Sequence, residues 1–250
     1  MTELAYLSGA EAAYTRAFNA RIVARPPGGV VLDRTFFYPT GGGQLADHGS
    51  LSVASGERTQ VMDVTKSGNS VIHRLARNFP AAFAVGAEVS GELDWERRHR
   101  HMRLHTAQHL VSALVFTRTG LRTRQASMAG NGGVIELEAP WPADHGIPKM
   151  QDVVARSVGA DLPVRVEHVP RARWQSSDAP RAGLVPLPAH VDPVRVIEIE
   201  GVDRCPCGGT HVRSTGEIGE VRLDEPVLSV AGRSRLAFTV GAPGPTTRPG

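Results

Sequence analysis

His105 and His109 are the first residues of the sequence whose type and spacing point to chemistry. They stand four residues apart in a segment expected to be helical, so both imidazoles lie on one face, one turn apart, where they can share a metal ion. The pair alone is a weak signal, because histidines at this spacing also occur on solvated helix faces.

A second half-site lies far downstream, at Cys207 and His211. Gly208 and Gly209 between them permit the positive φ angles that let a thiolate and an imidazole four residues apart converge. Three histidines and one thiolate would form a tetrahedral zinc site. An ordinary glycine turn with a buried cysteine is the alternative, but two half-sites in one chain favour a metal. Cys205 could replace Cys207 as the thiolate, and we keep it as a spare ligand.

The histidine pair lacks the glutamate that acts as general base in zinc proteases, because Thr106 follows His105. Neither Thr106 nor Gln108 accepts a proton near neutral pH. Hydrolysis here must therefore use a zinc-polarised water, a distant base or a group of the substrate. This favours an activated ester over a peptide bond as the substrate.

Residues 36–44 form a third unusual segment, in which three glycines follow two phenylalanines and a tyrosine. It is not a phosphate-binding P-loop, because no Lys-Ser or Lys-Thr follows the glycines. The composition favours a tight, aromatic-flanked loop over a ligand site. The glycines could also allow the backbone to approach a substrate closely.

The expected elements divide the chain into a β-rich region and a region of mixed helices and strands. Residues 20–92 predict a β-rich module with short strands at 21–24, 30–33, 60–65, 70–75 and 85–89, after a possible short helix at 4–18. Downstream we predict helices at 95–117 and 149–158, and strands at 134–138, 164–169, 194–200, 218–223 and 235–240. This pattern predicts an α+β fold with helices packed on a mostly antiparallel sheet.

The positive charge is concentrated in the first predicted long helix and the residues after it. Residues 94–124 contain seven arginines against two acidic residues, whereas the whole chain has a formal net charge of +3. Such a stretch suits a polyanion such as RNA, or it forms a solvated face. The sequence has no apolar run of about 20 residues and no signal segment, so we expect no membrane contact and a cytoplasmic location.

Taken in order, three stretches resemble the AlaX family, free-standing relatives of the editing domain of alanyl-tRNA synthetase, and its medium-length class in particular. They are residues 37–49, 94–110 and 205–219. The resemblance implies a small N-terminal β-barrel-like domain with the glycine-rich motif at 1–92 and a zinc-containing editing core at 93–241. Residues 242–250, which hold three prolines, are expected to be a disordered tail.

The resemblance also implies particular site residues. The family's metal ligands fall on His105, His109, Cys207 and His211, and a glutamine that lines the editing pocket in relatives falls on Gln125. Thr40 stands where the family often has a glutamate. The candidate catalytic residues are Gln125 and Thr106, and the candidate substrate-binding residues are Gly41, Gly42, Gly43, Gln44, Ser127, Arg100 and Arg103.

The implied activity is trans-editing: hydrolysis of alanine tRNA mischarged with serine, with glycyl-tRNA as an additional candidate. Zinc is the expected cofactor and mischarged alanine tRNA the expected partner, while the sequence leaves protein partners undefined. Two alternatives stay open. The chain could be a zinc-stabilised RNA-binding module without catalysis, or a related editing core that removes a different amino acid.

Overall fold

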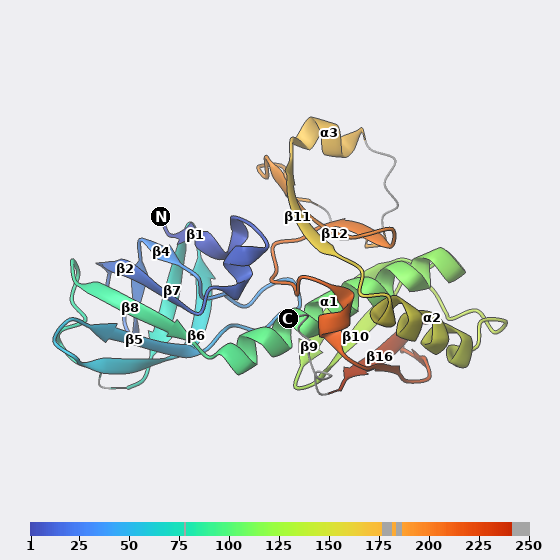
Figure 1. Ribbon diagram of the computed structural model, residues 1–250, viewed down its shortest axis with the longest axis horizontal. Coiled ribbons are helices and arrows are strands. Elements are labelled where there is room, and N and C mark those ends of the chain that lie inside the picture. Colours follow the sequence, from blue (N-terminus) through green and yellow to red (C-terminus); the bar gives the residue numbers. More distant parts are fainter. Residues whose placement is uncertain (78, 177–181, 184–186, 242–250) are drawn as a thin grey trace, which may run out of the picture. The chain divides into compact units, whose positions relative to one another are not determined.

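The computed structural model describes residues 1–250 except 78, 177–181, 184–186 and 242–250 (Figure 1). The tail predicted at 242–250 therefore lies outside the described residues. The chain forms two compact units, Met1–His101 and Met102–Gly250, each of which is described by itself. Among the described residues, no helix is both long and apolar enough to span a membrane.

Unit 1 is built around a closed barrel of six strands, in the order β2-β3-β7-β6-β5-β8. Each neighbouring pair is antiparallel. Buried and exposed residues alternate along β2 and β8, which is the period-2 pattern of strands with one face on a core. The strands are β2 (Ala17–Ala24), β3 (Gly29–Leu32), β5 (Gly49–Val53), β6 (Arg58–Ser67), β7 (Ser70–Leu75) and β8 (Glu88–Leu93).

The first residues of the chain correct one expectation. A helix at 4–18 was predicted, but the structure has β1 (Glu3–Leu4), two short 3-10 helices at Ala5–Leu7 and Glu11–Tyr14, and the start of β2. Neither 3-10 helix has a side-chain cap, and β1 pairs instead with β4 (Arg34–Thr35). The strand predicted at 85–89 was also misplaced, because the chain turns before β8 begins.

The predicted helix at 95–117 is present as α1 (Trp95–Thr119). Asp94 Oδ1 accepts a hydrogen bond from the Arg97 amide at 3.1 Å, which caps the helix. Gly120, with φ +73°, ends it in the left-handed conformation that favours glycine. The boundary between the two units falls inside α1.

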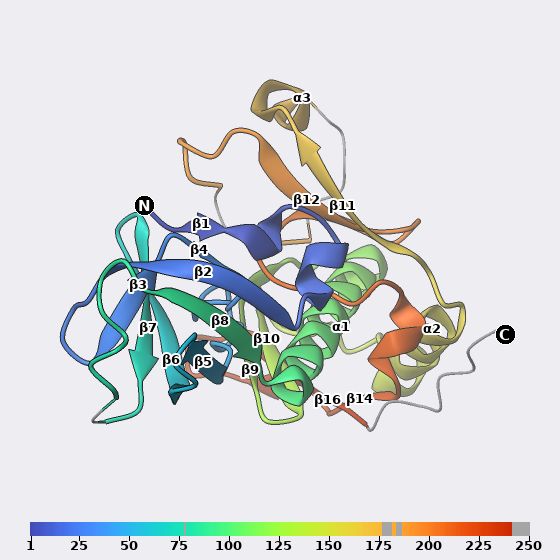
Figure 2. The ribbon, with the colours of Figure 1, turned by 60° about the vertical axis from the view of Figure 1, so that its left-hand side comes forward.

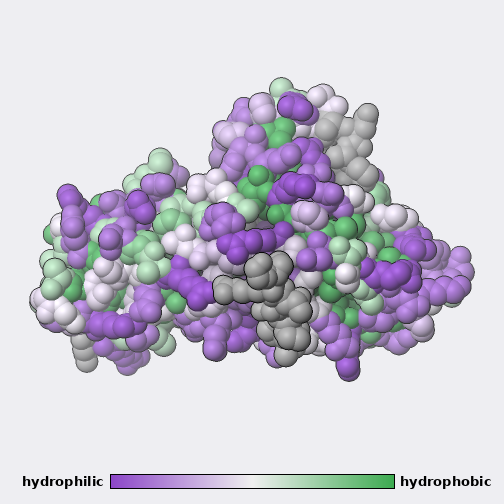
Figure 3. All heavy atoms as spheres, in the orientation of Figure 1, coloured by the Kyte–Doolittle hydropathy of each residue, from purple (hydrophilic) through white to green (hydrophobic). Residues whose placement is uncertain are grey.

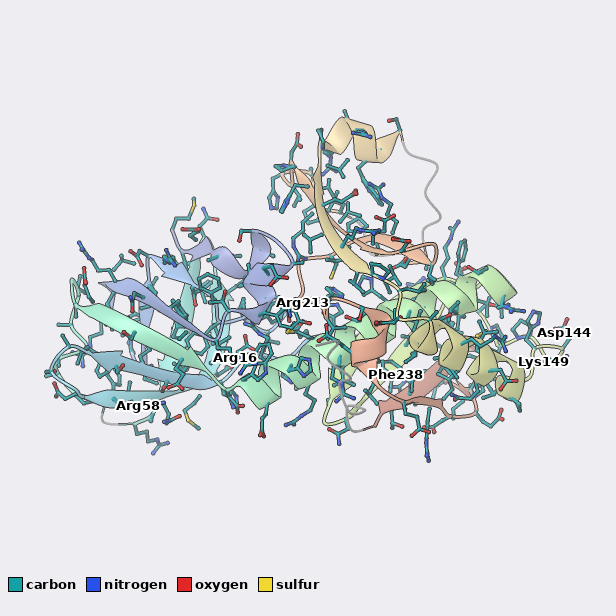
Figure 4. All side chains as sticks on the ribbon, viewed as in Figure 1. Arg16, Arg58, Asp144, Lys149, Arg213 and Phe238 are labelled. Carbon is teal, nitrogen blue, oxygen red and sulfur yellow. The ribbon has the colours of Figure 1, made fainter. Side chains whose placement is uncertain are left out.

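A five-stranded antiparallel sheet forms the larger layer of unit 2. Its order is β14-β16-β10-β9, with β15 paired to β16. Ile135, Leu236 and Phe238 are buried on its inner face, and Phe238 is labelled in Figure 4. Thr123 Oγ1 on β9 donates to Ser112 Oγ on α1 at 2.9 Å, so α1 lies against this face. The strands are β9 (Thr123–Ala129), β10 (Gly132–Leu137), β14 (Val221–Leu223), β15 (Val227–Leu228) and β16 (Ser234–Val240).

A smaller antiparallel sheet completes unit 2, with β11 (Val164–Val169), β12 (Val194–Ile199) and β13 (Asp203–Pro206) in that order. Figure 2 shows this sheet and the short α3 (Arg171–Gln175) above α1. The second predicted helix is α2 (Ile147–Gly159), and a 3-10 helix, η3, spans Thr215–Ile218. The predicted mixture of helices with mostly antiparallel sheets is confirmed. Hydrophilic residues cover most of the face drawn in Figure 3.

Candidate metal centre

Four side chains of unit 2 bring their ligand atoms together. His105, His109, Cys207 and His211 each offer one nitrogen or sulfur atom, and these atoms all lie within 4.8 Å of one another. Cys207 Sγ is 3.5 Å from His105 Nε2 and 3.4 Å from His211 Nε2. The three histidines are buried. The two half-sites expected from the sequence therefore form one cluster.

Helix α1 contributes the first half. His105 and His109 are four residues apart, and their ring centroids are 5.3 Å apart. The helical repeat places both on one face, as predicted. Because α1 is buried along this stretch, its ligands are held on a rigid element rather than on a loop.

The second half follows β13, where the chain leaves the small sheet. The Gly209 amide donates to Cys207 Sγ at 3.3 Å, and this contact begins the return toward His211. Neither Gly208 nor Gly209 has a left-handed φ, so the reason given for two glycines here is wrong. The ring of His211 nevertheless reaches Cys207 Sγ, at 3.4 Å from Nε2, without a left-handed glycine between them.

The protonation of the cluster favours a thiolate. Burial raises the pKa of Cys207, but the neighbouring His105, His109 and His211 lower it. The resulting pKa lies well below the ordinary value of a cysteine thiol. Burial lowers the pKa of His109, whereas Cys207 and Asp203 raise it, to about 10, so that without a metal this ring is an imidazolium paired with the thiolate. Burial and His105 lower the pKa of His211. The thiolate is the form of cysteine that binds a metal, and metal binding would release the additional proton of His109.

The geometry fits zinc. Zn–N bonds of about 2.0–2.1 Å and a Zn–S bond of about 2.3 Å in a tetrahedron place nitrogen and sulfur about 3.5 Å apart. The two S···N distances of 3.4 and 3.5 Å agree with this value. A Cys-His₃ donor set also has the soft and imidazole ligands that zinc prefers. His105, His109, Cys207 and His211 would hold the ion.

Three further residues contact the ligands from outside, and the sequence did not indicate these contacts for any of them. Asp203 Oδ2 lies 2.9 Å from His109 Nδ1. Arg195 donates to the Cys207 carbonyl at 2.6 Å. Thr106 Oγ1 lies 3.2 Å from His211 Nδ1. Asp203 could have been found, because strand alternation from Cys207 back through residue 205 puts it on the same face.

Thr106 was predicted to be catalytic, and that role stays a prediction. Like His105 and His109 on the same helix, it has a buried side chain. Its hydroxyl is 2.9 Å from the Met102 carbonyl, to which it donates, and it also contacts His211 and the Val212 amide. The hydroxyl therefore links α1 to the ring of His211 and to the backbone that follows it.

Cys205 is not part of the four-atom cluster. Its sulfur instead groups with His109 and Asp203. Burial, Asp203 and Cys207 all raise the pKa of the Cys205 thiol, which keeps it protonated. Because a metal binds the thiolate, Cys207 is the better ligand of the two.

Gln125 and Ser127 lie on β9 and are exposed. Gln125 pairs with Glu136 and Ser127 with Val134, so both side chains lie on the sheet face opposite Ile135. The contacts of the described residues link neither side chain to the cluster. The substrate roles expected for Gln125 and Ser127 stay predictions.

The substrate roles expected for Arg103 and Arg100 stay predictions. Arg103 is buried, and its guanidinium donates to the main-chain carbonyls of Glu217, Ile218 and Gly241. These hydrogen bonds from Nε and Nη2 tie α1 to η3. Arg100 is partly exposed.

The glycine segment in unit 1 forms a tight hairpin. Gly41 and Gln44 exchange two backbone hydrogen bonds of 3.0 Å around Gly42 and Gly43, whose φ angles are +58° and +84°. These are the angles of a two-residue type I′ turn, which favours glycine at both positions. The structural interpretation of this loop is confirmed. Gln44 is buried, and the substrate roles expected for Gly41, Gly42, Gly43 and Gln44 stay predictions.

Two protein-family models match parts of the chain. The one described as tRNA synthetases class II (A) matches residues 10–97, and the one described as the threonyl and alanyl tRNA synthetase second additional domain matches residues 194–232. The alanyl-tRNA editing protein AlaX-M of Saccharolobus solfataricus is 32% identical over 96% of this chain and 99% of its own length. The chain belongs to the AlaX family.

Alanine–tRNA ligases are similar to this AlaX-family chain as well. The ligase of Pyrobaculum neutrophilum is 36% identical over 92% of the chain, and that of Pyrococcus furiosus is 32% identical over 91%. The chain covers only 26% and 25% of these two ligases. It thus corresponds to about a quarter of a ligase, and to nearly the whole of the AlaX-M protein.

Proposed function

We propose that the chain is a trans-editing hydrolase that deacylates alanine tRNA mischarged with serine, with glycyl-tRNA as an additional substrate. One observation carries this proposal. A buried Cys-His₃ cluster with zinc-like spacing occurs in a chain that matches an alanyl-tRNA editing protein over almost its full length. The reaction is ester hydrolysis, which releases the amino acid and leaves the tRNA intact.

Physical chemistry explains the need for such an enzyme. A synthetic site shaped for alanine gains or loses only about 1–3 kcal/mol for glycine or serine, which differ from alanine by one small group. Errors at that level have to be removed by a second site. A site that hydrogen-bonds the serine hydroxyl rejects alanine strongly, because its polar groups would be left unpaired.

In this proposal, four side chains would hold the metal and Arg100 would position the tRNA. His105, His109, Cys207 and His211 bind zinc, which when bound supplies a Lewis acid that polarises an oxygen atom. Thr106 and Gln108 cannot serve as a base, so the proton acceptor is a water or a substrate group such as the vicinal ribose hydroxyl. The acceptor end of the tRNA is positioned through phosphate contacts, for which Arg100 is the candidate.

The finer architecture belongs to the same proposal. We assign the tRNA-facing role of the glycine-rich motif to an N-terminal domain at 1–92, and the chemistry to an editing core at 93–241. A cytoplasmic location follows from the substrate, because charged tRNAs are used there. The four-ligand count favours one competing function, a zinc-stabilised RNA-binding module without turnover.

A deacylation panel separates the two functions. Seryl-, glycyl- and alanyl-tRNA(Ala) would be incubated with the purified chain, and released amino acid would be measured together with bound metal. We expect about one zinc per chain, release of serine, and little release of alanine. Cys207→Ser should lose both zinc and activity, because a hydroxyl is a far weaker zinc ligand than a thiolate.

Cys205→Ser is the matched control. It changes the neighbouring thiol in the same way and should keep zinc and activity, because Cys205 lies outside the four-atom cluster. Zinc binding without release of any amino acid would support the RNA-binding module. Loss of zinc in Cys205→Ser and not in Cys207→Ser would overturn the assigned ligand set.

A further inference from the structure

Two of the candidate ligands, His109 and His211, are contacted at Nδ1 by side chains that are not themselves among the four ligands. The first is His109. Its Nδ1 lies 2.9 Å from Asp203 Oδ2, and both side chains are almost completely buried. An ionised carboxylate can only accept, so Nδ1 is the donor. The contact turns Nε2 of His109 toward the cluster.

The second held ligand is His211. Thr106 Oγ1 donates its proton to the Met102 carbonyl, which can only accept, at 2.9 Å. The oxygen is then an acceptor for His211 Nδ1 and for the Val212 amide, both at 3.2 Å. His211 Nε2 is thereby directed at Cys207 Sγ, 3.4 Å away.

Thr106 thus connects the two half-sites. It lies on α1 between His105 and His109, and it binds both the ring of His211 and the backbone that follows this ring. The same helix that supplies two ligands fixes the orientation of a third. Asp203 acts in the opposite direction, because β13 supplies the carboxylate that fixes a ligand on α1.

We propose that Thr106 and Asp203 are positioning residues that fix the tautomer and the ring orientation of His211 and His109, so that the site is organised before zinc arrives. The inference rests on the proposed zinc site and deepens it. Outer partners of this kind commonly contribute 10- to 100-fold to metal affinity. They restrict the rotation of each imidazole before the metal binds, so that less conformational entropy is lost on binding.

The decisive comparison is Thr106→Val against Thr106→Ser. Valine keeps the branched shape and removes the hydroxyl, while serine keeps the hydroxyl. Zinc affinity would be measured by competition with a coloured chelator, and ligand geometry by the visible spectrum of the cobalt-substituted protein. We expect Thr106→Val to bind zinc about 10- to 100-fold more weakly with an altered cobalt spectrum, and Thr106→Ser to match the wild type in both.

Asp203 is tested in the same assays. Asp203→Ala should weaken zinc binding at least as much as Thr106→Val, because it removes the partner of His109. Asp203→Asn should recover part of the loss, because its amide oxygen still accepts from Nδ1. Circular dichroism and the thermal midpoint would identify a variant that fails to fold. If Asp203→Ala does not fold, the zinc affinity of Asp203→Asn decides whether Asp203 positions His109.

Failure of the inference differs from failure of the proposed function. If the wild type binds zinc and Thr106→Val binds it with the same affinity and the same cobalt spectrum, the inference is wrong and the zinc site stands. Equal losses in Thr106→Ser and Thr106→Val would also overturn it, because the hydroxyl would not be the cause. A wild type that binds no zinc contradicts the proposed function itself.

Discussion

Each unit of the molecule buries a polar cluster, and the two clusters are satisfied in opposite ways. In unit 1, Arg98 and Asp47 are fully buried and form an ion pair. The Arg98 guanidinium also donates to the carbonyls of Ala13 and Phe36. Asp47 accepts in addition from the Tyr38 amide at 2.6 Å. Every charged group in this cluster meets a protein partner.

The cluster of unit 2 brings the ligand atoms of four side chains face to face. His109, His211 and Cys207 direct two nitrogens and a sulfur toward one another across less than 4.8 Å. Their remaining contacts, through Asp203 and Thr106, lie on the outer side. The difference teaches a rule of interpretation. A buried ion pair of one arginine and one carboxylate satisfies itself and is structural, whereas a thiolate facing three imidazoles is the donor set of a metal site.

The largest effect is expected from breaking the self-contained cluster. Arg98→Met removes the cation and leaves Asp47 buried and unpaired, which should lower the free energy of unfolding by about 3–5 kcal/mol. Urea unfolding followed by circular dichroism measures this change.

Arg58→Met is the matched control for Arg98→Met. The pair between Arg58 and Glu92 also joins an arginine to a carboxylate, but both side chains are more than half exposed. Arg58 is labelled in Figure 4. Removing it should change the free energy of unfolding by less than about 1 kcal/mol. Equal effects from the two variants would mean that burial does not decide the strength of these pairs.

A medium effect is expected from His73, a buried histidine of unit 1 that is not part of any convergent cluster. Its Nδ1 faces the Val30 carbonyl and its Nε2 the Thr35 hydroxyl. Burial lowers the pKa of His73 to about 4, from 6.5. A group whose pKa is lower in the folded state contributes stability that is present above pH 6.5 and lost as the pH falls toward 4.

The expected size follows from the two pKa values. At pH 5 this one group should reduce the free energy of unfolding by about 2 kcal/mol relative to pH 8. Urea unfolding at a series of pH values measures the change, and His73→Gln should make the dependence shallower. Some dependence should remain, because burial also lowers the pKa of His101 to about 4. An unchanged profile in His73→Gln would contradict the assignment.

The sequence predicted local features of the fold well and distant pairings poorly. Asp94 and Gly120 marked both ends of α1, because capping depends on neighbouring residues. The pair of Arg98 and Asp47 could not be found, since its members are 51 residues apart and meet only when the barrel forms. Strand β9 was missed, because its residues are mostly polar and exposed.

The candidate site shows the same division. His105 and His109 were found from helical spacing, and Cys207 and His211 from their proximity in the sequence. The outer contacts of Thr106 and Arg195 depend on which elements pack together, and spacing does not encode that. The expectation for Gly208 and Gly209 failed because glycine permits a left-handed φ without requiring it.

The smallest expected effects on stability come from single substitutions in the two glycine segments, one in each unit. Gly43 has a φ of +84° in the type I′ turn, so Gly43→Ala should cost about 1–2 kcal/mol of unfolding free energy. Gly208 lacks a left-handed φ, and a Cβ there would meet no atom within 4 Å, so Gly208→Ala should be nearly neutral. Thermal and urea unfolding of both variants measure the difference. If Gly208→Ala were the more costly change, the backbone described for the Cys207 loop would be wrong, and the convergence of its ligands would need a different explanation.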